Sequence, residues 1–514
     1  MGLSRRALIS STSALAAISS MAAIWPSGAI TARERLAQHV PATSPLGLDD
    51  DLKNPREVQS KDGRFELMLR MNITRQDLPY ASAQLRLYDG EIPGPTFRVS
   101  PGDDLEIALH NDMPPNTDKG SPVLNTPNEF NTTNLHFHGF HVSPKGNSDN
   151  VYLNINPGEG FNYLVRLPED HPAGNYWYHP HRHGSVAAQV ASGCAGMMIV
   201  RGALDDVPEI AEAVERVMVF QCPVVDPSTG VLDSYDTIWS LDSERYWLIN
   251  GEFQPRIYMR QGEVQHWRWL NAGDEQFLPM NVDGLELYEV GFDGNPYPAP
   301  RQTDKVFIAP GNRSNLMVKA PDVGVFDIMR PAFDQGKTAI PEVRMASVIV
   351  LPADTDRISS SVKMGTKLPS GPLPKNPLLT DITDDEIVAK RQITLGAEDV
   401  TGMYKGMVFT LNGQPFDPTR NDISPKLGTA EEWELINQTP FPHPIHVHVN
   451  PMQVTHINGE ALDYKHWQDT IAVPAAGTVT FRMRFTEFDG RFVMHCHILP
   501  HEDLGMMLNV NVTA

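Results

Sequence analysis

Histidines spaced two residues apart are the feature of this sequence that points most directly to chemistry. Four His-x-His pairs stand out: His136-Phe-His138, His179-Pro-His181, His446-Val-His448 and His495-Cys-His497, and an additional His183 follows the second of them. In a β-strand, residues i and i+2 point to the same face, so the two imidazoles of each pair can act together as metal ligands. A single pair is more often a surface or core feature, but eight imidazoles without metal would leave many buried ring nitrogens unsatisfied. The four pairs together therefore predict a metal centre.

A cysteine inside the last pair adds a second kind of ligand. Cys496 lies between the two histidines, so on a strand its sulfur points to the opposite face and would bind a separate metal ion. His443 lies three residues before the third pair, and His501 and Met506 follow Cys496 by five and ten residues. A thiolate, two imidazoles and a distant thioether are the ligands of a blue-copper electron-transfer centre. The plainer alternative is that Cys496 and Met506 are ordinary core residues.

The elements that must position these residues recur three times along the chain. Segments 102–111, 262–271 and 428–437 share one frame, which is Gly, eight residues and then Asn. Each segment follows an Asp-Gly or Asn-Gly turn dipeptide, and its apolar and polar residues tend to alternate, as in a half-buried strand. Three such copies at intervals of 160 and 166 residues predict three β-domains of similar topology.

Helical periodicity is nearly absent from the rest of the chain, and 43 prolines break it into short strand-like segments. This pattern predicts β-sandwiches or barrels, with at most short helices at residues 205–215 and 384–390. We place the three domains at residues 50–205, 206–365 and 366–514. The middle domain holds a single histidine, so the expected metal ligands come from the outer two domains.

Composition limits the partners and the compartment of the protein. The chain has 514 residues and a net charge of −21, which argues against nucleic acid as a partner. Its three cysteines cannot form a disulfide framework, and Cys194 and Cys222 are either two buried thiols or one disulfide.

The start of the chain predicts export. Residues 1–32 contain Arg5-Arg6 followed by an uncharged apolar stretch from Ala7 to Ile24, which resembles a twin-arginine signal peptide. An ordinary secretory signal is the alternative. No later segment offers about 20 uninterrupted apolar residues, so we expect a periplasmic or secreted protein without a membrane span.

In its motifs the sequence resembles the multicopper oxidases, in particular their three-domain, bacterial laccase-like branch. The motifs that carry the resemblance are DGEIPGPTFRVSPGD, NLHFHGFHV, YWYHPHRHG, HPIHVH and HCHILPHEDLGMM, and they occur in the order that the family shows. The resemblance implies an all-β fold of three cupredoxin-like Greek-key β-sandwich domains. It also implies four copper ions, which are one type 1 ion, one type 2 ion and a type 3 pair.

The resemblance also implies which residues hold each ion. The type 1 ligands would be His443, Cys496 and His501, with Met506 as the axial ligand. The type 2 ligands would be His136 and His446, and the type 3 ligands would be His138, His179, His181, His448, His495 and His497. The type 2 and type 3 ions would then form a trinuclear cluster between the outer domains, and the middle domain would be a spacer without ligands.

Three carboxylates match family positions or lie near them. Glu502 matches a position that supplies protons on the dioxygen side, and Asp149 is our candidate for the acidic residue near the type 2 ion. Asp469 resembles the acidic residue close to the type 1 site, where it would orient His443 or meet the substrate. The simpler interpretation of each is a solvated or capping residue.

By resemblance, electrons enter one at a time at the type 1 site and pass through Cys496 to the trinuclear cluster, where O2 becomes water. We expect a monomeric laccase-like oxidase of phenols and aromatic amines. The alternative is a metallo-oxidase of Cu(I) or Fe(II), which in this family often carries a methionine-rich insert. Residues 359–407 hold only three methionines, which lowers that alternative, although the negative charge could attract metal cations. A simple copper carrier or a nitrite reductase would leave the additional His-x-His pairs unexplained.

Overall fold

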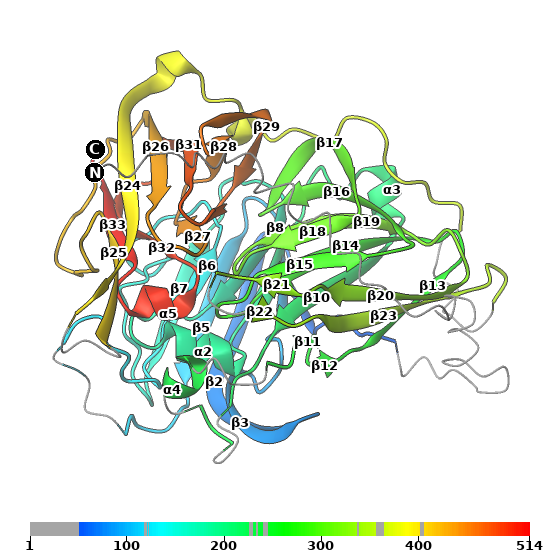
Figure 1. Ribbon diagram of the computed structural model, residues 1–514, viewed down its shortest axis with the longest axis horizontal. Coiled ribbons are helices and arrows are strands. Elements are labelled where there is room, and N and C mark those ends of the chain that lie inside the picture. The colour runs from blue at the N-terminus through cyan, green and yellow to red at the C-terminus, as the bar shows by residue number, and fades with distance from the viewer. Residues whose placement is uncertain are drawn as a thin grey trace, which may run out of the picture.

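The computed structural model describes residues 51–514, apart from 118–120, 122, 226–229, 233–234, 240–244, 337–338, 356–363 and 401–405. The expected export signal lies outside these residues. Nearly all of the regular structure is β-strand, which confirms the all-β fold class. Three pairs of sheets follow one another along the chain, running from blue through green to red in Figure 1. Among the described residues, no helix has the length and apolar character needed to span a bilayer.

The first domain consists of a four-stranded sheet, in the order β3-β2-β5-β7, and a five-stranded sheet, in the order β1-β4-β9-β8-β6. The strands are β1 (Glu57–Gln59), β2 (Arg64–Leu78), β3 (Ala81–Tyr88), β4 (Thr96–Val99), β5 (Asp104–Asn111), β6 (His136–His138), β7 (Gly160–Arg166), β8 (Gly174–His179) and β9 (Gly196–Val200). Side chains from both sheets form one hydrophobic core, as in a β-sandwich. One short helix, α2 (Val186–Ser192), lies between β8 and β9.

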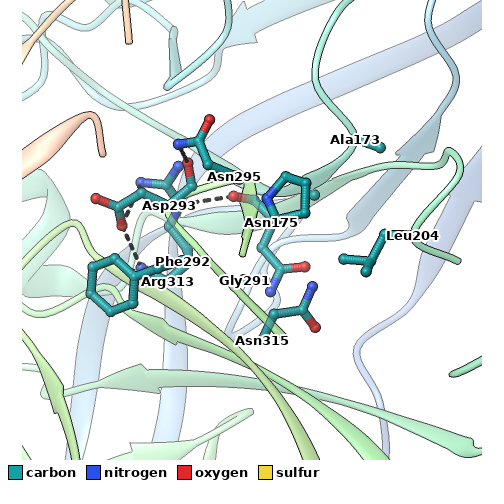
Figure 2. A pocket seen from close by; sticks show the side chains of 12 residues that line it. Ala173, Asn175, Leu204, Gly291, Phe292, Asp293, Asn295, Arg313 and Asn315 are labelled. Carbon is teal, nitrogen blue, oxygen red and sulfur yellow. Dashed lines mark hydrogen bonds and ion pairs between the residues drawn. The ribbon is translucent and has the colours of Figure 1, made fainter. Parts of the chain in front are cut away.

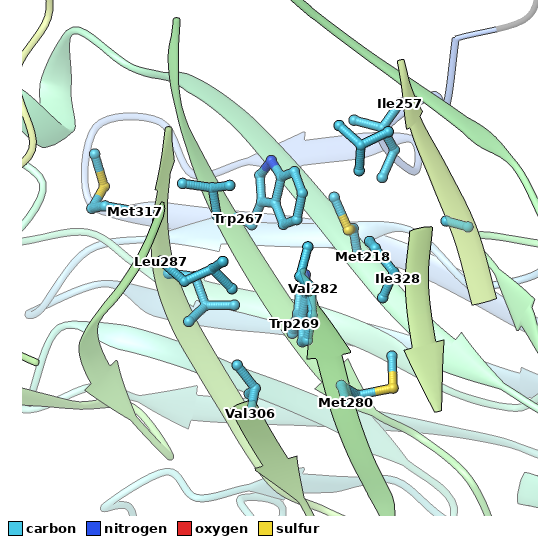
Figure 3. Close-up of a cluster of buried hydrophobic side chains, with 14 of the residues drawn as sticks. Met218, Ile257, Trp267, Trp269, Met280, Val282, Leu287, Val306, Met317 and Ile328 are labelled. Carbon is cyan, nitrogen blue, oxygen red and sulfur yellow. The ribbon is translucent and has the colours of Figure 1, made fainter. Parts of the chain in front are cut away.

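The middle domain pairs a seven-stranded sheet, β12-β11-β10-β14-β19-β16-β17, with a five-stranded sheet, β13-β23-β20-β15-β18. The strands are β10 (Val214–Gln221), β11 (Leu248–Ile249), β12 (Glu252–Phe253), β13 (Arg256–Arg260), β14 (Val264–Asn271), β15 (Leu278–Val282), β16 (Glu286–Phe292), β17 (Asn295–Thr303), β18 (Lys305–Ile308), β19 (Arg313–Lys319), β20 (Gly324–Arg330) and β23 (Val343–Leu351). A separate hairpin is formed by β21 (Phe333–Asp334) and β22 (Ala339–Ile340), and the helices are α3 (Pro208–Ala211) and α4 (Tyr235–Trp239). Figure 3 shows its core, where Trp267 and Trp269 pack against Met218 and Met280.

The last domain pairs a six-stranded sheet, β25-β24-β26-β31-β28-β29, with a four-stranded sheet, β30-β27-β32-β33. The strands are β24 (Ile387–Asp399), β25 (Met407–Leu411), β26 (Thr429–Asn437), β27 (His443–Val447), β28 (Met452–Ile457), β29 (Glu460–Gln468), β30 (Thr470–Val473), β31 (Thr478–Phe485), β32 (Gly490–Cys496) and β33 (Met507–Val512). The helical elements are η2 (Pro377–Leu379), η3 (Asp384–Glu386) and α5 (Leu499–Asp503). The expected domain boundaries remain predictions; residue 205 lies between β9 and β10, and residue 365 lies between β23 and β24.

The two expected helices are much shorter than predicted. In segment 205–215 only α3 is helical, and in segment 384–390 only the 3₁₀ turn η3, because β10 and β24 begin inside these segments. Both cysteines left open by the sequence, Cys194 and Cys222, are buried free thiols. The Cys194 Sγ–H donates to the Arg86 carbonyl at 2.9 Å, so this thiol is satisfied without a disulfide.

The three repeated sequence frames form equivalent strands. Strand β5 pairs in parallel with β2 and antiparallel with β7, β14 pairs in the same way with β10 and β19, and β26 with β24 and β31. The closing residues of the frames, Asn111, Asn271 and Asn437, are all buried. The amide N–H2 of each donates to two backbone carbonyls, and its oxygen accepts the N–H of the second residue after it. Each asparagine thereby fastens the loop that leaves its strand.

We predict that Asn271→Ala lowers the stability of the middle domain. The substitution leaves two buried carbonyls and one buried N–H without their partner, at a cost of roughly 2–4 kcal/mol in total. For a domain of this size, that cost lowers the thermal unfolding midpoint by about 5–10 °C, which calorimetry measures. Gln302→Ala, at an exposed position of β17, is the control and should shift the midpoint by about 1 °C or less. Equal shifts in the two variants would contradict the role of the asparagine.

Candidate metal centre

Eight histidines from the first and last domains meet in one buried group, which we call the histidine cluster. Its members are His136, His138, His179, His181, His446, His448, His495 and His497, and none is more than 2% exposed. Their ring atoms form overlapping groups of three whose atoms all lie within 4.8 Å of one another: His138, His179 and His497; His181, His448 and His495; and His136, His138 and His446. Four histidines come from each outer domain, so the cluster exists only where the two domains meet.

Two pairs of strands bring these residues together. Strand β6 runs antiparallel to β8 with His136 opposite His179, and β27 runs antiparallel to β32 with His446 opposite His495. Only the pair on β6 lies entirely within a strand, because the other three pairs extend past a strand end. In the pair on β8, Pro180 has no N–H to donate and follows the last strand residue. The same-face argument thus applies to one pair, yet all four pairs converge.

The ring nitrogens of the cluster fit metal ions. Among the described residues, His136 Nε2, His138 Nδ1, His179 Nε2, His446 Nε2 and both nitrogens of His497 are buried without a hydrogen-bond partner. The Nε2 atoms of His181 and His448 lie 3.0 and 3.2 Å from His495 Nε2, so nitrogen faces nitrogen. Burial lowers the pKa of every ring in the cluster, to about 4 for His181 and His495, so the rings are neutral. Neutral imidazoles offer lone pairs that cations accept.

A second buried group lies around the cysteine. The Sγ of Cys496 is 3.4 Å from His443 Nδ1 and 3.8 Å from His501 Nδ1, and the two Nδ1 atoms are 3.3 Å apart. The Ile498 N–H points to the sulfur at 3.4 Å, and Met506 is buried in the same hydrophobic core. We call His443, Cys496 and His501 the cysteine site. It is separate from the histidine cluster, although Cys496 is bonded through the backbone to His495 and His497 on either side.

A neighbouring hydroxyl orients one ring of the cysteine site. The Thr439 Oγ1 lies 2.8 Å from His443 Nε2. If His443 donates its Nε2–H to this oxygen, its Nδ1 keeps a lone pair that faces the sulfur. Burial lowers the pKa of His443 to about 3, which keeps the ring neutral. The Asn437 side chain accepts the Thr439 N–H at 2.9 Å, so the repeated asparagine of the last domain positions this hydroxyl.

Asp149 lies against the histidine cluster. Both of its carboxylate oxygens are 3.0 Å from His136 Nδ1, and Oδ1 also accepts the Phe137 N–H at 3.0 Å. The contact places the ring proton of His136 on Nδ1 and leaves Nε2 for a metal ion. Burial raises the pKa of Asp149 to about 8, an effect larger than that of the backbone hydrogen bond.

Glu502, on α5, lies between two rings of the same cluster. Its Oε2 is 2.9 Å from His495 Nδ1 and its Oε1 is 3.5 Å from His181 Nδ1. Neither oxygen makes a well-formed hydrogen bond to a described residue. Burial raises the pKa of Glu502 to about 7, while the neighbouring His181 lowers it. A buried carboxyl in this position can hold or release a proton beside the cluster.

The expected contact between Asp469 and His443 is wrong. The Oδ1 of Asp469 lies 3.0 Å from His138 Nε2, and its backbone carbonyl accepts the His446 Nδ1–H at 2.7 Å. In the pairing of β27 with β30, His446 lies opposite Thr470, whereas His443 lies opposite Val473. The register therefore places Asp469 beside the histidine cluster, at the other end of the strand from His443.

Two residues that the sequence did not lead us to predict also lie beside the histidine cluster. Asp503 accepts the N–H groups of Gly184 and Ala187 and the hydroxyl of Tyr235, and thereby fastens α5 to the start of α2. Arg313, from the middle domain, forms a bidentate ion pair with Asp469. Asp503 directly follows Glu502 in the motif HCHILPHEDLGMM, and its place in that motif is a signal by which it could have been predicted. Arg313 has no comparable signal, because the middle domain carries no ligand motif.

Comparison with known proteins identifies the class to which this geometry belongs. Sequence profiles described as multicopper oxidase match residues 71–204, 241–350 and 374–514. Because these matches cover most of the chain, the protein belongs to the multicopper oxidase family. Copper cofactors, O2 and a reducing substrate follow from that membership, as does oxidoreductase activity.

Individual relatives are distant in sequence. The multicopper oxidase mco of Staphylococcus haemolyticus is 23% identical over 447 residues, which are 83% of each chain. The laccase of Bacillus subtilis strain 168 is 24% identical over 526 residues, covering 91% of this chain and 98% of its own. The solved multicopper oxidase of Campylobacter jejuni, described as a metallo-oxidase, is 25% identical, with a TM-score of 0.71 over 90% of this chain and 95% of its own. These similarities confirm three cupredoxin-like domains.

We predict that Thr439→Val weakens copper binding at the cysteine site. Valine has nearly the shape of threonine but cannot accept the His443 Nε2–H, so the ring loses its fixed orientation. Loss of such a contact lowers metal affinity by about 10–100-fold, which a competitive copper titration followed by the blue absorption measures. Thr455→Val is the matched control, because Thr455 is buried in the same domain and donates to the Thr480 carbonyl. A parent-like titration for Thr439→Val would contradict the prediction.

Proposed function

We propose that this protein is a laccase-like oxidase, which couples one-electron oxidation of phenols and aromatic amines to four-electron reduction of O2 to water. The position of Cys496 carries the proposal. It lies in the cysteine site with His443 and His501, while its two neighbours in the chain belong to the histidine cluster. A short covalent path therefore joins the two sites. Bound copper supplies one-electron redox chemistry at the cysteine site and O2 reduction at the histidine cluster.

We assign four copper ions to these ligands. The type 1 ion would be held by His443, Cys496 and His501, with Met506 as a further ligand. The type 2 ion belongs to His136 and His446, and the type 3 pair belongs to His138, His179, His181, His448, His495 and His497. The groups of three ring atoms support this division, and so do the unpartnered nitrogens. We also propose that the protein is exported to the periplasm or secreted, and that it acts as a monomer.

Carboxylates beside the histidine cluster handle protons in this proposal. Glu502 holds a proton close to His181 and His495, and its buried carboxyl can release it where O2 is reduced. Asp149 keeps the proton of His136 on Nδ1 and fixes the ring. Asp469 acts in the same way on His138 rather than at the substrate site.

The surroundings of His501 favour an aromatic electron donor. His501 is 8% exposed, whereas His443 and Cys496 are fully buried, so substrate approaches through its ring. Phe409 stacks on this ring with centroids 3.9 Å apart, and the partly exposed Phe441 lies 5.6 Å from it. Apolar aromatic walls suit phenols and aromatic amines better than hydrated metal ions. Oxidation of Cu(I) or Fe(II) is the second candidate, because the Campylobacter jejuni neighbour is described as a metallo-oxidase.

We predict opposite spectroscopic results for two variants of the copper-loaded protein. Cys496→Ser should abolish both the blue absorption and O2 uptake while the fold persists, because serine cannot supply a soft thiolate. His138→Ala should keep most of the blue absorption but stop O2 reduction, because it removes a ligand of the histidine cluster only. Visible absorption, an oxygen electrode and circular dichroism measure the three properties. Retained blue absorption in Cys496→Ser would refute the assignment of the cysteine site.

The donor is tested by O2 uptake of the parent protein with a methoxyphenol, Cu(I) and Fe(II) under matched conditions. We expect faster uptake with the phenol, since the partly exposed aromatic ring of Phe441 lies beside His501. Faster uptake with either metal ion would replace the laccase assignment with the metallo-oxidase. No uptake with any donor at full copper load would overturn both.

A further inference from the structure

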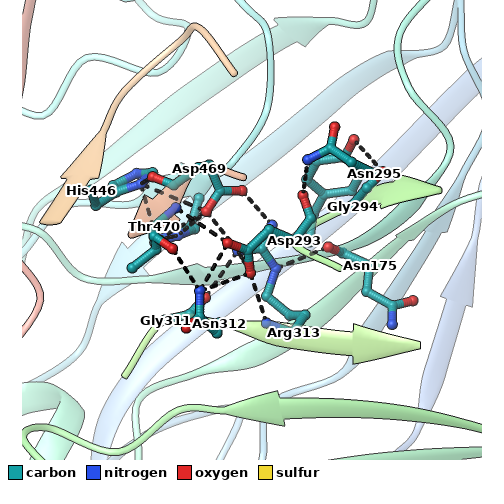
Figure 4. Close-up of polar contacts among 12 residues, drawn as sticks. Asn175, Asp293, Gly294, Asn295, Gly311, Asn312, Arg313, His446, Asp469 and Thr470 are labelled. Carbon is teal, nitrogen blue, oxygen red and sulfur yellow. Dashed lines mark hydrogen bonds and ion pairs between the residues drawn. The ribbon is translucent and has the colours of Figure 1, made fainter. Parts of the chain in front are cut away.

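Arg313 joins all three domains although the middle domain supplies no candidate ligand. The side chain is fully buried, and its Nη1 and Nη2 donate to Asp469 Oδ1 and Oδ2 at 2.8 and 2.5 Å. Its Nε donates to the Asn175 carbonyl in the first domain at 2.9 Å, and Nη1 also donates to the Gly311 carbonyl. Figure 4 shows these groups together at the domain junction. The guanidinium thus donates to acceptors from all three domains.

The carboxylate held by Arg313 is the one that faces the histidine cluster. The Oδ1 of Asp469 lies 3.0 Å from His138 Nε2, and the Thr470 hydroxyl lies 3.1 Å from the same nitrogen. The Asp469 oxygens accept from Arg313 and from the Thr470 hydroxyl, so His138 Nε2–H is the donor at this contact. The Nδ1 of His138 is the buried ring atom without a partner, and it is left free for metal. The backbone carbonyl of Asp469 orients His446 in the same way.

The middle domain holds this arrangement rigidly. Asp293 accepts the Arg313 backbone N–H at 3.0 Å and the Thr470 backbone N–H at 3.2 Å, and Asn312 donates to the Thr470 carbonyl at 2.9 Å. The crevice in Figure 2, lined by Arg313, Asp293 and Asn175, is too narrow for a water molecule. The guanidinium therefore has no room for a water molecule beside it on that side.

Close packing restricts the carboxylate further. At Gly139, where φ is +87°, an added Cβ would collide with Asp469 Oδ2 and lie 2.8 Å from Arg313 Nη2. Glycine is needed here because both the backbone conformation and the close approach exclude a side chain. The backbone of Gly139 thus packs directly against the Asp469 carboxylate and Arg313.

We propose that Arg313 is a positioning residue of the histidine cluster. Through Asp469 it fixes the ring orientation of His138 and the nitrogen that carries its proton, so the middle domain sets the geometry of a site to which it gives no ligand. The inference rests on the proposed copper assignment. The competing explanation is that Arg313 only braces the domains.

Arg268 offers a matched control for that explanation. It is also a buried arginine of the middle domain, it donates to the Asn175 side chain at 2.8 Å, and it pairs with Glu215 and Asp205. It therefore joins the first two domains as Arg313 does. Its hydrogen-bond and ion-pair partners among the described residues are Glu215, Asn175 and Asp205, none of them a histidine of the cluster.

The test compares Arg313→Lys and Arg268→Lys in the copper-loaded protein. Lysine keeps the charge but cannot hold both carboxylate oxygens in a planar fork. We expect both variants to unfold at lower temperature than the parent. Only Arg313→Lys should alter the near-ultraviolet absorption of the type 3 pair, to which His138 is assigned, and lower copper affinity at the histidine cluster by about 10–100-fold, with blue absorption retained.

Several outcomes would overturn the inference about Arg313 or the proposed function. Parent-like near-ultraviolet absorption of the type 3 pair and a parent-like copper titration in Arg313→Lys, or the same changes in Arg268→Lys, would overturn the inference. If Arg313→Lys does not fold, Asp469→Asn takes its place, because an amide has one oxygen and its N–H2 cannot accept from Arg313 Nη2 as Asp469 Oδ2 does. Unchanged near-ultraviolet absorption of the type 3 pair there would also overturn the inference. Absence of type 1 and type 2 signals in the parent would instead refute the proposed function itself.

Discussion

Eight neutral imidazoles packed in the interior are the constraint on which the rest of this structure depends. Each buried ring nitrogen without a partner costs on the order of 1–3 kcal/mol, and six such nitrogens lie in the histidine cluster. The carboxylates of Asp149, Asp469 and Glu502 each contact the other ring nitrogen of a cluster histidine and so limit that cost. Bound cations remove much of the remainder, so metal binding and folding stability are coupled in this chain.

The strand that ends in a buried asparagine occurs once in each domain, and it supports the histidine cluster and the cysteine site in different ways. In the last domain the asparagine that ends the frame positions Thr439, which in turn orients His443. In the middle domain the backbone of Asn271 pairs with the Gly311–Asn312 segment, from which Arg313 reaches the junction. The same local device therefore supports a candidate ligand in one domain and an interdomain arginine in another.

The sequence predicted local features well and long-range register poorly. The repeated frames are strands β5, β14 and β26, because the alternation of apolar residues and the turn dipeptides act locally. Asp469 was misplaced because the pairing of β27 with β30 decides which histidine it faces, and that register is not encoded in the neighbouring residues.

Interdomain contacts and short helices were missed for related reasons. Arg313 begins an ordinary strand, and only the docking of three domains gives it a role. Helices α2 and α5 are short and fully buried, so they lack the polar face that makes helical periodicity visible in a sequence.

The division of the histidine cluster between distant parts of the chain has a consequence for biosynthesis. His181 and His495, which touch in the folded protein, are 314 residues apart. At about 5–20 residues per second, a ribosome needs roughly 15–60 s to bridge that distance. Until then the first domain displays four histidines without their counterparts, as a half-site that any available divalent ion could occupy. Correct metallation is therefore a late event, governed by which ions the nascent chain meets before its last domain has folded.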